Sequence, residues 1–242
     1  TSKVAEYILA AREMGISILP VDVNKSVAEF GVEGKNIRFG FNAVKSMGRP
    51  TITAIIEERT NNGDFHSMQD FITRMAGVIN KRTVEHLILA GAFDTFGNTR
   101  RGMMNVYERM IDSAVKQNKD AISGQMSLFD FVSEEDKQSL EMKVPDIQEF
   151  EKEDLLEREK EVLGVYVTGH PLDEYTGMWG KHVSARSTDF LIDEETGETK
   201  AADSTKQTIG GLVRNIKVNT TKTGQQMAYL TIEDFVGSVE VI

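Results

Sequence analysis

Apolar residues recur at helical spacing along most of the first half of the chain. Val4, Ile8 and Ala11 share one face of a predicted first helix. The apolar run at 16–19 and the alternating run at 37–41 predict two short strands in the stretch that follows. These elements carry no candidate chemistry and are typical of a scaffold.

Two pairs of short helices are predicted next, and a tight turn joins the members of each pair. The first pair comprises residues 43–45 and 50–62, and its turn is Ser46-Met47-Gly48. The second pair comprises residues 67–75 and 81–90. Each pair is a helix–hairpin–helix unit, and the two units stand in tandem.

Polar residues mark where the later helices begin. Ser67, Asn80 and Asn98 each precede an apolar-periodic run and are predicted helix caps. The helix after Asn98 carries one apolar stripe that we interpret as core packing, made by Met103, Val106, Met110 and Ala114. A charged helix is predicted over residues 147–163, with a packing face of Leu155, Leu156, Val162 and Leu163.

The tail of the chain alternates between apolar and polar residues. Strands are predicted over 208–218, 227–232 and 238–242, with a hairpin turn at 221–224. Glycines in the first strand allow the sharp curl of a small barrel. This pattern is similar to the first half of an OB-fold. The predicted fold class is therefore multidomain, mainly α, followed by a partial β OB-fold.

The composition is that of an ordinary globular protein, with 242 residues of which 40% are hydrophobic and 27% charged. The lack of cysteine excludes disulfides, thiolate metal sites and a cysteine nucleophile. The sequence has neither a signal peptide nor an apolar run of membrane-spanning length, so we expect a cytoplasmic location. A start without Met and an end inside a strand pattern favour a fragment of a longer protein.

The net charge of −10 argues against nucleic-acid binding by the chain taken as a whole, because neutralising phosphates needs Lys and Arg. The charges are unevenly distributed, however. Residues 35–109 hold 11 basic against 7 acidic residues, a net of +4, and residues 134–161 hold 5 against 12, a net of −7. A mildly basic module is thus followed by an acidic connector, and residues 206–242 are close to balance, with 4 basic and 3 acidic.

The two hairpins are candidate phosphate-binding sites. Backbone N–H groups and the positive end of the helix dipole favour an anion where the second helix of each unit begins. Lys45 and Arg49 flank the first turn. Lys81 and Arg82 lie in a first helical turn, where cations oppose the dipole, so an external anion explains them better than helix stability. The alternative is an ordinary helical corner with solvated cations, and the arginines at 100–101 are either a solvated face or further phosphate contacts.

A short apolar motif, Gln125-Met126-Ser127-Leu128-Phe129, follows the long helix. Leu128 and Phe129 are adjacent anchors that fit one hydrophobic pocket on a partner, and Gln125 offers an amide for hydrogen bonding. The alternative is a local turn in which Leu128, Phe129 and Phe131 pack on their own domain.

Two further side chains invite a functional interpretation that we do not favour. His170 has no Cys, Ser or carboxylate at a suitable spacing nearby, so we expect a structural role for it. Tyr229 on the second predicted strand of the tail is either core or a stacking platform for bases, and we favour core.

The order of these parts resembles the C-terminal half of the alpha subunit of bacterial DNA polymerase III, a C-family replicative polymerase. The similar segments extend over nearly the whole chain and include residues 13–20, 91–94 and 165–172. The resemblance implies that Gln125–Phe129 docks on the ring-shaped sliding clamp. It also implies that Lys45, Ser46, Met47, Gly48 and Arg49 grip duplex DNA, together with Lys81 and Arg82 in the second unit. Ser46 stands where the family often has glycine.

The resemblance implies a part of a DNA-directed DNA polymerase that supports processive synthesis. The palm carboxylates that hold Mg ions in this family lie outside the chain, so we expect no catalytic residue, no metal site, no cofactor and no polymerisation by the chain alone. The expected partners are the duplex backbone, the clamp, other replisome subunits and, through the OB strands, single-stranded template, but no membrane. The alternatives are a DNA repair or replication protein that reuses these modules without being a polymerase, and an interaction scaffold without a DNA role.

The implied division of the chain has five parts. They are the end of a fingers-like domain at 1–40, the tandem helix–hairpin–helix domain at 41–118, a flexible segment with the clamp motif at 119–145, an acidic helix and connector at 146–205, and a truncated OB-fold at 206–242.

Overall fold

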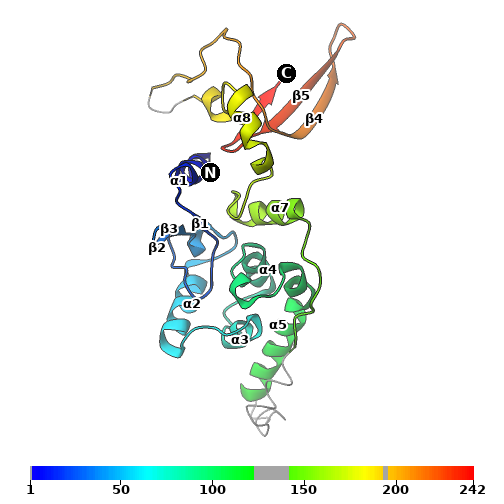
Figure 1. Ribbon diagram of the computed structural model, residues 1–242. Coiled ribbons are helices and arrows are strands. Elements are labelled where there is room, and N and C mark those ends of the chain that lie inside the picture. The colour runs from blue at the N-terminus through cyan, green and yellow to red at the C-terminus, as the bar shows by residue number, and fades with distance from the viewer. Residues whose placement is uncertain (1, 123–141, 193–195) are drawn as a thin grey trace. The chain divides into compact units, whose positions relative to one another are not determined.

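The computed structural model describes residues 2–122, 142–192 and 196–242 (Figure 1). The chain divides into two compact units. The larger unit is Ser17–Thr168, and the smaller unit combines Thr1–Ile16 with Gly169–Ile242. Helices dominate the larger unit and an antiparallel sheet lies at the end of the chain, which confirms the predicted class of a mainly α region followed by a partial β domain. The division into five parts and the assignment of the sheet to an OB-fold stay predictions.

The larger unit begins with a small three-stranded sheet of β1 (Ile18–Leu19), β2 (Gly31–Glu33) and β3 (Asn36–Arg38). The strand order is β1-β3-β2, with β1 parallel and β2 antiparallel to β3. The strand predicted at 37–41 is shorter than expected, because Phe41 is already the first residue of the 3-10 turn η1 (Phe41–Ala43).

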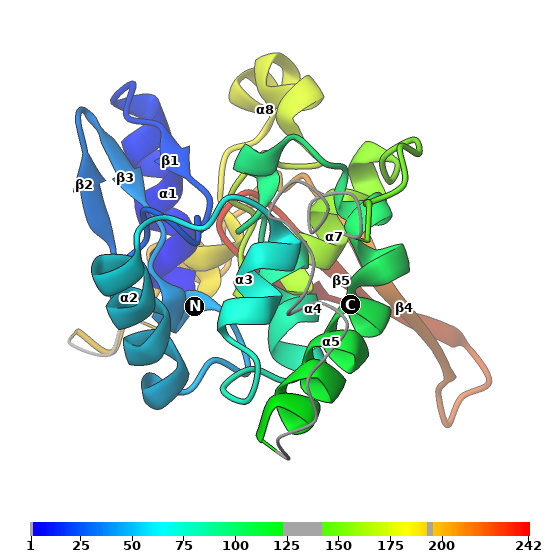
Figure 2. The same ribbon diagram turned by 90° about the horizontal axis from the view of Figure 1, so that it is seen from below.

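Helices build the rest of the larger unit. They are α2 (Arg49–Asn62), α3 (Met68–Arg74), α4 (Lys81–Leu89), the 3-10 turn η2 (Asp94–Phe96), α5 (Arg100–Ile122) and α7 (Lys152–Leu163). α3 and α4 both pack against α5 (Figure 2). Their shared core is aromatic, since Phe71 contacts Phe65 and Phe93 edge to face at ring-centroid distances of 5.0 and 5.1 Å, and all three rings are buried.

Two of the three predicted helix caps are confirmed. The Ser67 hydroxyl accepts a hydrogen bond from the Asp70 N–H at 3.0 Å, and the Asn80 side chain accepts one from the Thr83 N–H at 2.9 Å. The prediction for Asn98 is wrong, because α5 begins one residue later than that cap requires. Thr99 accepts the hydrogen bond from the Gly102 N–H at 3.0 Å instead.

The apolar stripe of α5 packs in the core as predicted, because Met103, Val106, Met110 and Ala114 are all buried. The charged helix is shorter than expected. α7 begins at Lys152, whereas a start near 147 was predicted. Leu156, Val162 and Leu163 lie on its buried face as predicted, whereas Leu155 is only half-buried. Glu159 lies on this face without having been predicted. Among the described residues, no helix is both long and apolar enough to cross a membrane.

The smaller unit holds helices from both ends of the chain and one sheet. Its elements are α1 (Ser2–Glu13), the 3-10 turns η4 (Asp173–Tyr175) and η5 (Ser187–Phe190), α8 (Thr176–His182), β4 (Leu212–Thr220), β5 (Gln226–Glu233) and β6 (Ser238–Val241). The strands form an antiparallel meander in the order β4-β5-β6. β4 begins later than predicted, at Leu212, where the pairing with β5 starts.

His170 has the structural role that the sequence indicated. Its side chain is 4% exposed and its ring lies 4.7 Å from that of Phe235. The Nδ1 atom accepts a hydrogen bond from the Leu172 N–H at 3.1 Å, and the His170 N–H donates to Asp173 at 2.7 Å. The residue therefore fixes the start of η4. Its Nδ1 atom is buried and already hydrogen-bonded.

Candidate nucleic-acid interface

The first hairpin joins η1 to α2 through residues 44–48. Ser46 has a φ of 65°, in the left-handed region that favours glycine. Gly48 is the N-cap residue of α2 and, having no side chain, provides no cap. Pro50 occupies the first turn of the helix and has no N–H, so the N–H groups of Arg49 and Thr51 are left for an external acceptor.

Lys45 fastens this hairpin to two other helices of the larger unit. Its N–H donates to the Val162 carbonyl at 2.9 Å and its Nζ to the Glu161 carbonyl at 2.7 Å, so both bonds reach the last turn of α7. Its own carbonyl accepts a hydrogen bond from His86 Nδ1 of α4 at 2.7 Å. Lys45 therefore positions the turn, and its ammonium group already has a partner.

Arg49 is exposed and makes no side-chain hydrogen bond or ion pair with any described residue. It lies at the first position of α2, next to the uncapped N–H groups. A cation opposes the helix dipole at this position. No acidic residue in the first turn of α2 offsets this unfavourable interaction between Arg49 and the helix dipole. An external anion would be favoured by Arg49 and by the helix dipole together.

The other helices that begin in or beside the hairpins already have an acceptor at their N-termini. Ser67 caps α3 and Asn80 caps α4. At α5 the carboxylate of Glu149 accepts hydrogen bonds from the N–H groups of Arg100 and Arg101, at 2.6 and 2.9 Å. The N-terminus of α5 thus holds an internal anion, whereas α2 has no side-chain acceptor at all. Among α2 to α5, α2 is the helix suited to a phosphate from outside.

The second hairpin is built differently from the first. Gly77 has a φ of 97°, a single bridge pairs Ala76 with Ile79, and the Val78 side chain is 47% exposed at the turn. The Asn80 side chain caps α4 by accepting a hydrogen bond from the Thr83 N–H. The second unit therefore presents its turn to solvent, and its second helix has a side-chain cap that α2 lacks.

Lys81 has internal partners that the sequence did not indicate. Its Nζ lies 3.1 Å from Asp112 and 3.2 Å from Glu108, both on α5. The hydrogen bond to Asp112, followed by that to Glu108, raises the pKa of the Lys81 ammonium. An external anion is therefore not needed to explain this cation in the first turn of α4. Arg82 is the exposed cation of the pair and has no side-chain partner among the described residues.

The arginines at 100–101 separate into two different roles. Arg100 is 3% exposed, so it is neither a solvated cation nor a phosphate contact. Its Nη2 lies 2.7 Å from Asp94, its Nη1 donates to the Leu89 carbonyl at 2.8 Å, and Nη1 also lies 3.4 Å from Glu159 of α7. Burial alone would lower the pKa of Arg100, but the hydrogen bond to Asp94 and the charges of Asp94 and Glu159 outweigh it and raise that pKa. Arg101 remains exposed.

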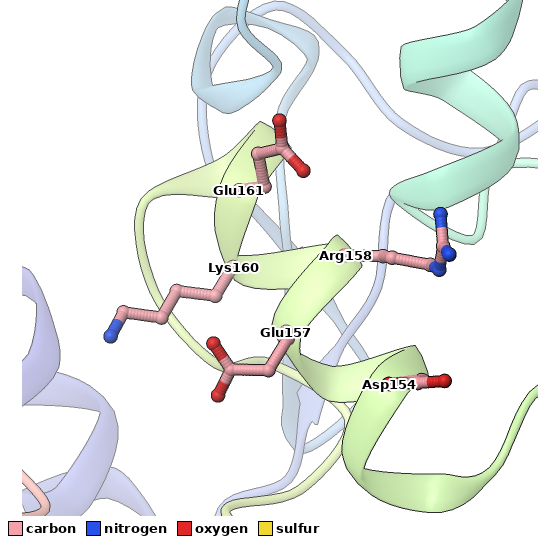
Figure 3. Close-up of a pocket in the computed structure, with 5 residues that line it drawn as sticks. All are labelled: Asp154, Glu157, Arg158, Lys160 and Glu161. Carbon is pink, nitrogen blue, oxygen red and sulfur yellow. The ribbon is translucent and has the colours of Figure 1, made fainter. Parts of the chain in front are cut away.

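A charged hollow with a volume of about 510 Å³ lies along α7 in the larger unit. Figure 3 shows Glu157 and Lys160 reaching to one side of the helix and Asp154 and Arg158 to the other. Acidic and basic groups are mixed here, and Glu157 already accepts a hydrogen bond from the Tyr166 hydroxyl. This surface therefore lacks the single sign of charge that a phosphate site needs. The described residues contain no cluster of side chains suited to a metal ion.

The comparison with known proteins agrees with this geometry. A family model described as a helix-hairpin-helix motif matches residues 15–103. A DNA polymerase III alpha subunit of Thermus aquaticus is 36% identical over 249 residues, which is 100% of this chain and 19% of the relative. The alpha subunits of Saccharopolyspora erythraea and Vibrio cholerae are each 34% identical and cover 99% and 100% of the chain. The chain is homologous to a segment of the DNA polymerase III alpha subunit.

The chain spans about a fifth of the length of these polymerase relatives. The helix–hairpin–helix match covers both hairpins and supports DNA binding by this region. The clamp motif Gln125–Phe129 lies outside the described residues, so its role stays a prediction. Two residues of the interface were missed by sequence reasoning. They are His86 and Glu149, because no local signal marks His86 as a partner of the first hairpin or Glu149 as the acceptor for α5.

The positive φ of Ser46 leads to a stability prediction. Replacing Ser46 with glycine removes the steric cost of the left-handed conformation but adds freedom to the unfolded chain. We expect Ser46→Gly to raise the free energy of unfolding of the larger unit by about 0.5 kcal/mol, and Ser46→Val to lower it by about 1–2 kcal/mol. Urea unfolding followed by helical circular dichroism measures both. Equal stabilities for the glycine and valine variants would contradict the strained turn.

Proposed function

We propose that this chain forms the part of a DNA polymerase III alpha subunit that grips the backbone of duplex DNA and binds the sliding clamp. The observation that carries the duplex-binding proposal is the uncapped N-terminus of α2, with the exposed Arg49 beside it. Relatives that match along the whole chain are polymerase subunits, which favours this role over that of a repair protein or an interaction scaffold.

The proposed duplex contact is a backbone contact. A phosphate oxygen accepts hydrogen bonds from the N–H groups of Arg49 and Thr51 at the start of α2. The Arg49 guanidinium adds a charge-assisted hydrogen bond. Arg82 supplies a second cation from α4, and Lys45 holds the turn in place through α4 and α7. None of these groups reads a base edge, so the grip is independent of DNA sequence. Lys81 contributes only if a phosphate displaces its two carboxylate partners.

The proposed clamp contact is the motif Gln125–Phe129. Tethering to a ring on the DNA raises the local concentration of polymerase at the primer end. A tethered polymerase needs only weak duplex binding, which suits a chain with a net charge of −10. Processivity in this proposal comes from the clamp, and the hairpins orient the duplex.

The chemistry of nucleotide transfer is assigned to other parts of the polymerase, and we propose no catalytic residue, metal site or cofactor in this chain. The sheet β4-β5-β6 is proposed as the start of an OB-fold. Lys217 pairs in register with Tyr229 across β4 and β5, and Lys217 is exposed. Lys217 thus offers a cation to single-stranded template, while the half-buried Tyr229 keeps the core role that we favour for it. We propose that the protein works in the cytoplasm.

The duplex grip is tested by replacing Arg49 and Arg82 with alanine together. If each arginine contacts one phosphate, the plot of log affinity against log salt concentration should become shallower by about 1–2 units, and affinity at low salt should fall for every duplex sequence tested. Fluorescence anisotropy of a labelled duplex across a salt series measures both quantities.

A matched control removes the same positive charge from elsewhere in the larger unit. Lys35 lies between β2 and β3 and Arg109 on α5, and both are exposed. The Lys35→Ala/Arg109→Ala variant should keep a salt dependence close to that of the parent chain. Equal slopes for the two double variants would remove the hairpins from the interface. The further pair Lys45→Ala/Arg49→Ala tests the first hairpin alone, and an unchanged slope there would remove its assignment.

A further inference from the structure

His86 lies where the two helix–hairpin–helix units meet. It is on α4, the second helix of the second unit, and its Nδ1 bonds to the carbonyl of Lys45 in the first hairpin at 2.7 Å. Because a carbonyl oxygen only accepts hydrogen bonds, Nδ1 carries the proton. The orientation of the ring is therefore fixed by the first hairpin, and the ring joins the two units.

The second nitrogen of the ring is available for a ligand. Nε2 makes no hydrogen bond with any described residue, and the side chain is only partly buried. Arg82 precedes His86 by four residues on the same helix, so the two side chains lie on the same face of α4. The ring thus shares a helix face with Arg82 of the second helix–hairpin–helix unit and is bonded to the hairpin of the first.

We propose that His86 is a further contact to the DNA backbone, and that its protonation links duplex affinity to pH. The inference rests on the proposed duplex-binding function of the hairpins. With Nδ1 committed to Lys45, neutral His86 presents a bare acceptor at Nε2, which repels a phosphate oxygen. Protonated His86 presents an N–H donor and a positive charge at the same place.

The charges around the ring favour a phosphate over any cationic ligand. The charged groups on the first hairpin, on α4 and in the last turn of α7 are Lys45, Arg49, Lys81, Arg82, Glu85, Lys160 and Glu161. On α5, Glu108 and Asp112 are paired with Lys81, and Arg100 is buried with Asp94 and Glu159. Apart from the pairs that Lys81 makes with α5, these three elements carry four cations and two carboxylates, and this net positive charge favours an anion from outside.

The test measures the affinity of the 242-residue chain for a labelled duplex at constant ionic strength from about pH 8 to about pH 6, the range in which histidine changes charge. The parent chain should bind about five- to tenfold more tightly at the lower pH, as expected for one added charge-assisted hydrogen bond. His86→Gln keeps a neutral donor for Lys45 but cannot gain charge. This variant should match the parent at high pH and lose most of the increase at low pH.

Two further variants separate the proposal from other causes of pH dependence. His66→Gln removes another exposed histidine of the larger unit, and this variant should keep the full pH dependence. His86→Lys carries a permanent charge and should bind tightly across the whole pH range. If His86→Gln keeps the pH dependence of the parent, His86 is not the titrating contact and the inference is overturned. If the Arg49→Ala/Arg82→Ala variant binds as the parent does, the hairpin function itself fails, and the inference fails with it.

Discussion

Replacing Glu159 with alanine is expected to lower the free energy of unfolding of the larger unit by about 3–5 kcal/mol. Glu159 is a fully buried carboxylate on α7, with an exposure of 0%. One oxygen accepts hydrogen bonds from the N–H groups of Val167 and Thr168 at 2.6 and 2.9 Å. The other accepts one from the Thr168 hydroxyl at 2.8 Å and lies 3.4 Å from Arg100 Nη1.

The large effect comes from the groups that the substitution leaves behind. Without Glu159, Arg100 remains buried with Asp94 as its carboxylate partner among the described residues, and the Val167 and Thr168 N–H groups lose the bonds to Glu159. The free-energy cost of a buried charge or donor that has lost its partner is far larger than the net stabilisation that the original pair contributes. The double variant Arg100→Met/Glu159→Leu removes both charges and should therefore be less destabilised than Glu159→Ala.

Equilibrium unfolding in urea, followed by hydrogen exchange of α5 and α7 amides, measures this prediction. Glu161→Ala is the matched control, because Glu161 is an exposed glutamate in the last turn of the same helix. Its substitution should change stability by less than about 0.5 kcal/mol. Fluorescence of Trp179, the single tryptophan of the chain, follows the smaller unit separately. Similar losses for Glu159→Ala and Glu161→Ala would refute the buried pair as a source of stability.

The Arg100–Glu159 pair also illustrates which features the sequence could predict. Elements that depend on neighbouring residues were predicted well, including the caps at Ser67 and Asn80 and the buried stripe of α5. Apolar periodicity and side-chain acceptors at helix starts act within a few residues, so a single sequence records them. The boundary errors at α5 and α7 are of one to five residues, where several polar residues compete to begin a helix.

The polar contacts that organise the interface could not be predicted, because they join residues far apart in the chain. Arg100 and Glu159 are 59 positions apart, Arg100 and Glu149 are 49 apart, and His86 and Lys45 are 41 apart. An arginine or glutamate in a helix looks the same in sequence whether it faces solvent or a partner from a distant helix. The charge pattern marked residues 35–109 as basic but did not indicate which of their cations are already paired. Within the part of the chain that the structure describes, Arg49 and Arg82 are exposed and have no side-chain partner, whereas Lys81 and Arg100 are held by carboxylates.

Replacing Leu128 and Phe129 with alanine together is expected to abolish detectable binding to the sliding clamp. The two residues are adjacent apolar anchors in the proposed motif, and truncating two anchors of a short peptide motif costs about 4 kcal/mol or more, which is roughly a thousandfold in affinity. Surface plasmon resonance with immobilised clamp measures the loss. Duplex affinity should stay unchanged, because in the proposed function the cations of the hairpins carry that binding.

A control substitution distinguishes docking from local packing. Phe131→Ala removes a large apolar side chain two residues beyond the motif and should leave clamp binding intact. If Leu128, Phe129 and Phe131 instead pack together on their own domain, all three substitutions should lower thermal stability alike and clamp binding should survive in each variant. A Leu128→Ala/Phe129→Ala chain that still binds the clamp would therefore assign the motif to packing. In a full-length polymerase, Leu128→Ala/Phe129→Ala should shorten the DNA products made in a single binding event. The reason is that the clamp tether raises the effective concentration of a weakly bound enzyme at the primer end without changing its contacts with DNA.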